Sequence, residues 1–143
     1  MRKNNEKTNA FLIHISSFAG FMFPFGHIIT PLIAWQTLKD RSAYLDEQGK
    51  EAVNFNISYT LYVILLSIIF IPFAFGSIFR NNIDWNHFNF SFDIDSHNLF
   101  GFLGLGSITA IIYLVGIVLV IVASLKAKEG ENYKYPFTIK FIK

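Results

Sequence analysis

Residues 99–125 read LFGFLGLGSITAIIYLVGIVLVIVASL, without a single Lys, Arg, Asp or Glu. Two further windows, 11–38 and 54–79, also lack charged side chains. Because about 20 apolar residues in a helix cross the hydrocarbon core of a bilayer, each window is long enough to span it. The windows predict an all-α membrane protein with three hydrophobic helical segments, at about 11–38, 57–79 and 99–125.

The composition supports a membrane environment. Of the 143 residues, 52% are hydrophobic and 15% are charged, whereas soluble domains carry about 25% charged residues. A single domain of this size could not bury so much apolar surface in water. A net charge of +2 without a basic helix gives no reason to expect nucleic acid as a partner.

No motif in the chain indicates catalysis. The sequence has no cysteine, which excludes disulfides and thiol chemistry. It contains no nucleophile–base pair, metal-binding box or phosphate-binding loop. We therefore expect a protein that is not an enzyme, binds no cofactor and forms one integral membrane domain over residues 1–143.

The first hydrophobic segment contains residues that disturb a helix. Pro24 and Pro31 each remove a backbone donor, and Gly26 lies between them. Two arrangements remain open: a single kinked span over 11–38, or a broken, re-entrant segment whose halves, 11–23 and 28–38, are each too short to cross.

Basic residues suggest the orientation. If the first segment re-enters, 11 of the 12 Lys and Arg residues share one side and only Arg80 lies on the other. A single span divides them 4 against 8. The positive-inside rule favours the sharper asymmetry. Both arrangements place loop 39–56 and tail 126–143 in the cytoplasm and loop 80–98 outside, and the side of the amino terminus stays unassigned.

Loop 39–56 predicts a short cytoplasmic amphipathic helix that leads into the second segment. Asp46 is a suitable N-cap for it. Glu47 and Glu51, four residues apart, share one face of this helix, which we interpret as solvated or facing lipid headgroups. Asn54, at the edge of the apolar run, is a candidate for contact with the tail, and so is Asn56.

The tail alternates aromatic and polar positions. A period of two and the Tyr135–Pro136 step predict an extended segment. Its apolar face would touch the membrane interface or the protein, and its lysines would attract anionic lipid. Alternatively, the tail docks on Asp46, Glu47 and Glu51. The apolar positions of this pattern are Tyr133, Tyr135, Phe137, Ile139 and Phe141.

Histidines and carboxylates supply the remaining candidates. His14 and His27 lie inside the first segment, where ionisable residues are functional candidates by default, although a structural hydrogen bond is the preferred interpretation. In the extended aromatic outer loop, Asp93-x-Asp95-x-His97 has donors at alternate positions, but solvated side chains explain it better than a metal ion.

Several strings resemble a known family: His14-Ile-Ser, Pro24-Phe-Gly26, residues 29–35, 46–55 and 126–136. On these strings the chain resembles small bacterial and archaeal membrane proteins grouped as domain of unknown function 4870. That family is distantly similar to a chloroplast inner-envelope protein-import channel component. The resemblance covers nearly the whole chain and implies a membrane topology but no activity. The outer loop is longer than the family pattern.

Two functions fit these observations. The first is a noncatalytic accessory or scaffold protein of the bacterial cytoplasmic membrane, whose partners are the lipid bilayer, itself or other membrane proteins. The alternative is an oligomeric pore or translocation component, suggested by the broken first segment. Candidate structural or interaction residues are His14, His27, Pro24, Pro31, Asp46, Glu47, Glu51, Asn54, Tyr133, Tyr135 and Pro136.

Overall fold

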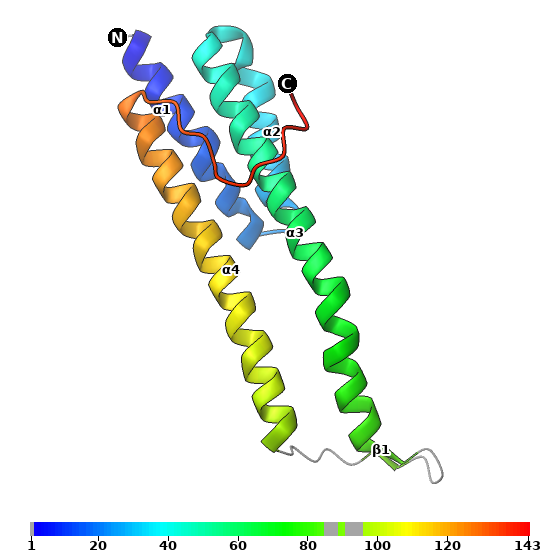
Figure 1. The fold of residues 1–143 in the computed structure, drawn as a ribbon. Helices are drawn as coiled ribbons and strands as arrows, with labels where there is room; N and C mark the ends of the chain where they lie inside the picture. The colour runs from blue at the N-terminus through cyan, green and yellow to red at the C-terminus, as the bar shows by residue number, and fades with distance from the viewer. Residues whose placement is uncertain (1, 85–88, 91–95) are drawn as a thin grey trace. The chain divides into compact units, whose positions relative to one another are not determined.

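The computed structural model describes residues 2–84, 89–90 and 96–143, and nearly all of its regular structure is helical (Figure 1). The chain divides into two compact units, Met1–Leu61 with Val115–Lys143 (unit 1) and Tyr62–Leu114 (unit 2). The elements are α1 (Arg2–Ile15), the 3-10 helix η1 (Ser16–Phe21), α2 (Gly26–Leu38), the 3-10 helix η2 (Lys39–Arg41), α3 (Ala43–Asn82), β1 (Ile83–Asp84), β2 (Asn89–Phe90) and α4 (Ser96–Glu129).

The first hydrophobic segment is broken rather than kinked. After η1 the backbone turns, with Phe25 in the left-handed region at φ 61°, and α2 begins at Gly26. A side chain at Gly26 would overlap the carbonyl of Ala19, so only glycine fits this close approach. Pro24 lies in the turn, where its missing donor costs nothing. The turn therefore folds α1, η1 and α2 into a hairpin.

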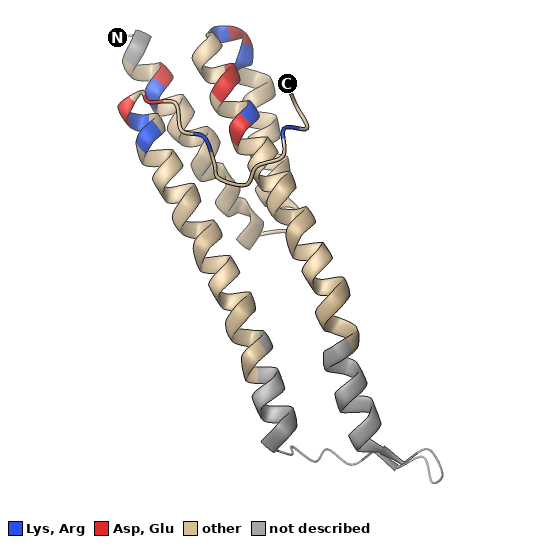
Figure 2. Ribbon diagram, in the orientation of Figure 1, with Lys and Arg blue, Asp and Glu red and all other residues tan. Residues whose placement is uncertain are grey.

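Both ends of this hairpin lie at one end of unit 1. The Lys7 ammonium donates a hydrogen bond to the carbonyl of Glu129 at 2.8 Å, which joins α1 to the end of α4. The Tyr44 hydroxyl donates to the carbonyl of Ala127 at 2.8 Å, which joins the start of α3 to the same place. Figure 2 shows that the charged residues of unit 1 gather at this end.

The amphipathic helix is not a separate element. It forms the start of α3, which continues through Pro72 as one helix of 40 residues. The prediction of Asp46 as its N-cap is wrong, because the helix begins at Ala43 and the Ser42 hydroxyl accepts a hydrogen bond from the amide of Leu45 at 3.3 Å. Both residue types cap helices well, and spacing alone did not distinguish them.

The core of unit 1 joins α1, α3, α4 and the tail. One buried cluster consists of Ala10, Ile13, Leu45, Ala52 and Ala127. A second consists of Phe55, Val120, Ala123 and Tyr135. Small residues of α4 contribute to close packing here, since a side chain at Gly116 would meet the ring of Tyr59.

Unit 2 contains the adjoining parts of α3 and α4 and a two-stranded antiparallel ribbon. Ile83 pairs with Phe90, and Asp84 pairs with Asn89. Its helices expose large apolar side chains, among them Leu65, Ile68, Ile69, Ile111 and Leu114. The predicted metal-binding pattern of the outer loop lies outside the described residues at Asp93 and Asp95, and the side chain of His97 is not described either.

Two helices are long and apolar enough to cross a membrane, over Ala43–Pro72 and Gly106–Glu129. Only 17% of the first apolar window and 22% of the second are buried inside the protein. The core helix of a soluble protein is buried on most of its surface. The large exposed apolar surface of these two helices is instead typical of helices that lipid surrounds.

Candidate functional site

A chain of hydrogen bonds, buried at His14 and exposed at Glu47, fastens the tail to α1 and α3. His14, fully buried on α1, places Nδ1 3.0 Å from the hydroxyl of Tyr135 and Nε2 2.7 Å from Oε1 of Gln48. The side-chain amide of Gln48 donates the next hydrogen bond, to Oδ1 of Asn132 at 3.0 Å. Asn132 in turn donates to the carboxylate of Glu47 at 2.8 Å.

The partners fix the direction of every bond. The carboxylate of Glu47 only accepts, so Asn132 presents its amide nitrogen to Glu47 and its oxygen to Gln48. Gln48 then presents its oxygen to His14, which must carry its proton on Nε2. The Tyr135 hydroxyl therefore donates to Nδ1 of His14. We call His14, Gln48, Asn132, Tyr135 and Glu47 the relay.

Tyr135 is also the main apolar anchor of the tail. Its ring stacks on Phe55 of α3, with centroids 4.0 Å apart and planes 11° apart, and Tyr133 contacts it edge-on at 5.3 Å. Only 5% of Tyr135 is exposed. Burial raises the pKa of its hydroxyl above the usual value, with further contributions from Tyr133 and Glu51 nearby. Tyr135 therefore stays protonated and keeps its role as donor.

A second set of contacts holds the end of the tail. The side chain of Asn54 accepts from the amide of Ile142 and donates to its carbonyl, both at 2.9 Å. One turn further along α3, the hydroxyl of Ser58 accepts from the amide of Ile139 at 2.9 Å. The side chain of Asn54 thus binds both the amide and the carbonyl of Ile142, as the backbone of a neighbouring β-strand would. We call Asn54 and Ser58 the clamp.

The three carboxylates expected to receive the tail have different partners. Asp46 accepts from Nε1 of Trp35 at 2.8 Å and pairs with Lys50 at 2.6 Å. Glu47 contacts the tail through Asn132, and Glu51 lies nearly buried close to Tyr135. Among the described ion pairs, none joins a tail lysine to these carboxylates. The tail therefore docks on this region through hydrogen bonds and ring packing.

The alternating pattern of the tail is only partly realised. After Glu129, the structure describes every residue of the tail and assigns none of them to a helix or strand. Tyr135 points inward, but Phe137 adopts a positive φ of 57°, which reverses the chain and ends the alternation. The expectation that all five apolar positions share one face is therefore wrong.

The other candidates lie outside the relay and the clamp. His27 lies 2.7 Å from the hydroxyl of Thr60, so α2 is joined to α3. Asn56 donates to Ser17 at 2.9 Å rather than to the tail. Pro31 is buried inside α2, and Pro136 is exposed before the reversal at Phe137. The two histidines of the first segment thus bind different partners.

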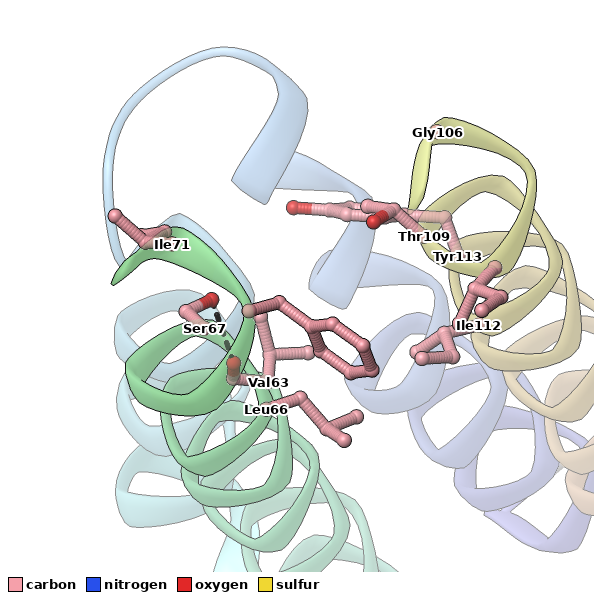
Figure 3. A pocket seen from close by; sticks show the side chains of 10 residues that line it. Val63, Leu66, Ser67, Ile71, Gly106, Thr109, Ile112 and Tyr113 are labelled. Atoms are coloured by element: carbon pink, nitrogen blue, oxygen red, sulfur yellow. Dashed lines mark hydrogen bonds between the residues drawn. The ribbon is translucent and has the colours of Figure 1, made fainter. Parts of the chain in front are cut away.

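Unit 2 contains a separate cavity of about 270 Å³ between its two helices (Figure 3). Its wall is apolar except for hydroxyls such as that of Ser67, which donates to the carbonyl of Val63 at 2.7 Å. Among the described residues, no three His, Asp or Glu side chains are grouped to hold one metal ion. The lining residues are Val63, Leu66, Ser67, Phe70, Ile71, Gly106, Ile108, Thr109, Ile112 and Tyr113.

Gln48, Ser58 and Asn132 are the important residues that sequence reasoning missed. A signal for Gln48 exists, since Leu45, Gln48, Ala52 and Phe55 follow helical spacing and all are buried. A polar residue on an apolar stripe needs a buried partner. No comparable signal marks Ser58, because serine is common in membrane helices and bonds to its own helix.

Comparison with known proteins assigns a family. A family model described as the magnetosome magnetite crystal formation protein family (MamF/MmsF) matches residues 5–142. This match overturns the resemblance to domain of unknown function 4870 and to the chloroplast import component. The shared strings correctly indicate a small membrane protein, but the family that they suggest is wrong. No curated protein and no solved structure shows significant similarity to the chain.

Proposed function

The chain belongs to the MamF/MmsF family of magnetosome magnetite crystal formation proteins, and on that premise we propose that it acts in crystal formation as a noncatalytic accessory protein. Family membership and two long, exposed apolar helices identify it as a membrane protein. The observation that carries the proposal is the docked tail. The relay and the clamp use buried polar side chains of unit 1, namely His14, Gln48, Asn54 and Ser58, to hold the tail against the helices, which suits a scaffold.

The proposed topology has two spans and a re-entrant hairpin. The contacts of Lys7 with Glu129 and of Tyr44 with Ala127 support an amino terminus on the same side as the tail. That arrangement gives the 11-to-1 distribution of basic residues, so this side is cytoplasmic. The family description names the magnetosome, and the bacterial cytoplasmic membrane stays a prediction.

The tip of the hairpin suits an apolar environment. Phe21, Met22, Phe23 and Phe25 are all exposed. The amides of Met22 and Phe23 both donate to the carbonyl of Ala19, at 3.0 and 3.2 Å. Irregular backbone is tolerated at membrane depth when its polar groups are satisfied internally. These features support a tip that enters the bilayer without crossing it.

Labelling of introduced cysteines tests the topology, because the chain has none of its own. We expect Asn4→Cys and Glu131→Cys to react from the same side of a sealed membrane, and Asp93→Cys from the opposite side. If Asn4→Cys reacts only from the side of Asp93→Cys, the first segment spans and the re-entrant arrangement is wrong.

Removal of the gene tests the role in crystal formation. We expect cells without the protein to form magnetite crystals of altered size or shape by electron microscopy, and the intact gene to restore them. A variant with Tyr135→Ala, which loses both the relay donor and the stacked ring, should restore them incompletely. Unchanged crystals after removal would contradict the proposed role.

An oligomeric pore or transport component is the second candidate. The helices broken at residues 22–25 favour it, since transporters place binding sites at such breaks. Two spans cannot enclose a path in one chain, so this function needs several copies. Crosslinking in native membranes that yields only monomers would contradict it, whereas a ladder of oligomers of fixed size would favour it over the accessory role.

A further inference from the structure

Residues 136–141 of the tail, between Tyr135 and Ile142, present apolar side chains outward. Phe137 is 88% exposed, and Ile139 and Phe141 are also exposed. Three large apolar residues within five positions are unusual on a surface that faces water. The loop 136–141 therefore needs a less polar environment than the cytoplasm.

This exposure is built into the backbone. Tyr135 holds one end of the loop, and the clamp holds the amides of Ile139 and Ile142 at the other. Between these anchors, Phe137 occupies the left-handed region, which is unfavourable for a bulky residue and persists only when its surroundings enforce it. The anchors thus fix an unfavourable conformation that directs the loop away from the protein.

The anchors also define the level of the loop along α3. Asn54 begins the uncharged window, and Ser58 lies about 6 Å further along the helix. Amphipathic segments at a membrane surface place their apolar side chains about 5–10 Å below the headgroup boundary. Tail lysines at 134, 140 and 143 are exposed close to these side chains in sequence, and the inner leaflet is anionic.

We propose that loop 136–141 is a lipid-binding element that enters the interface of the membrane crossed by α3 and α4. Phe137, Ile139 and Phe141 contact the upper acyl chains, and the three tail lysines contact anionic headgroups. The inference rests on the membrane topology proposed above, because it requires the tail to lie on the same membrane surface as the start of the second segment.

Depth-dependent fluorescence quenching tests this contact in the full-length protein, reconstituted into vesicles. A polarity-sensitive fluorophore is attached to Phe137→Cys, and in a second preparation to Phe141→Cys. Lipids brominated at a shallow acyl position should quench both labels, and their emission should shift to the blue. The matched control is Glu131→Cys, an exposed tail residue before the anchors, which should keep the emission of a label in water.

A third label separates failure of this inference from failure of the topology. Ile68→Cys lies on the exposed apolar face of α3 and should be quenched by deeper bromine atoms. If Ile68→Cys is quenched while Phe137→Cys and Phe141→Cys resemble Glu131→Cys, the lipid contact is wrong and the loop faces a protein. If Ile68→Cys is not quenched, the proposed span itself is wrong.

The lysines are tested with the same labels. Adding phosphatidylglycerol to phosphatidylcholine vesicles should increase the quenching of Phe137→Cys. Replacing the lysines at 134, 140 and 143 with Gln should abolish that increase while leaving Ile68→Cys unchanged. Equal quenching in both lipids would overturn the headgroup part of the proposal.

Discussion

The hydroxyl of Tyr135 donates a hydrogen bond of 3.0 Å to Nδ1 of His14, a residue 121 positions earlier in the chain. This bond and the stack on Phe55 join the last segment of the chain to the first helix and to α3. Because His14 is fully buried, its nitrogen atoms cannot turn to water if a partner is lost. The pair therefore contributes to docking of the tail near Tyr135, separately from the clamp at Ile139 and Ile142.

Replacing Tyr135 with Phe should reduce stability while preserving the ring stack. The change leaves Nδ1 of His14 buried without a donor, and an unsatisfied buried group costs about 1–3 kcal/mol. Thermal unfolding in detergent micelles should show a lower midpoint. The matched control is Tyr133→Phe, whose ring keeps its edge-on contact with Tyr135 and which should change the midpoint little. Equal effects of the two variants would contradict the relay.

Alkaline pH should release the tail through the same residue. Burial raises the pKa of Tyr135, so the folded protein holds this proton more tightly than the unfolded chain. The stability that Tyr135 contributes is fully present below the ordinary tyrosine pKa of about 10 and is lost as the pH rises above it. Between about pH 8 and 11, the unfolding midpoint of the native protein should therefore fall more than that of Tyr135→Phe. Parallel curves would show that Tyr135 is not the group responsible.

Gly49→Ala should destabilise the protein although alanine is the better helix former. In an open position the change gains up to about 1 kcal/mol. At Gly49, however, a Cβ atom would overlap the ring of Trp35, and forced packing costs about 1–3 kcal/mol. Gly104→Ala is the matched control, since a Cβ there meets nothing within 4 Å. Unfolding in detergent should rank the control above the native protein and Gly49→Ala below it.

The helical part of the fold could be predicted because its causes are local. Uncharged windows require an apolar environment, and Pro24 with Gly26 marks where the first segment departs from a straight helix. The sequence leaves open whether the segment kinks or breaks there, because the break depends on the close approach of Gly26 to the carbonyl of Ala19. The N-cap is not decided by the local sequence, because Ser42 and Asp46 are both suitable caps. In the structure the carboxylate of Asp46 is already used by Trp35 and Lys50.

The conformation of the tail could not be predicted to the same extent, because it depends on residues of α1 and α3 that are far away in the sequence. Its alternation suggests one apolar face, but the direction of each side chain depends on where α1 and α3 place hydrogen-bonding groups. The positive φ of Phe137 exists because Tyr135 and Ile139 are held on either side of it. No property of the local sequence specifies such a reversal at a phenylalanine.

Asn54→Ala should loosen the end of the tail without unfolding unit 1. The substitution removes both hydrogen bonds to Ile142, while Tyr135 remains docked through His14 and Phe55. If each lost bond contributes about 1 kcal/mol, amide exchange at Ile142 should accelerate by roughly tenfold or more. Exchange measured by mass spectrometry should rise in peptides covering residues 139–143 and stay unchanged around residue 135. Ser67→Ala serves as the control, because Ser67 donates only within its own helix among the described contacts.

Asn54→Asp should give an intermediate result, since a carboxylate still accepts from the amide of Ile142 but faces its carbonyl without a donor. Unchanged exchange in Asn54→Ala would show that the clamp does not hold the tail.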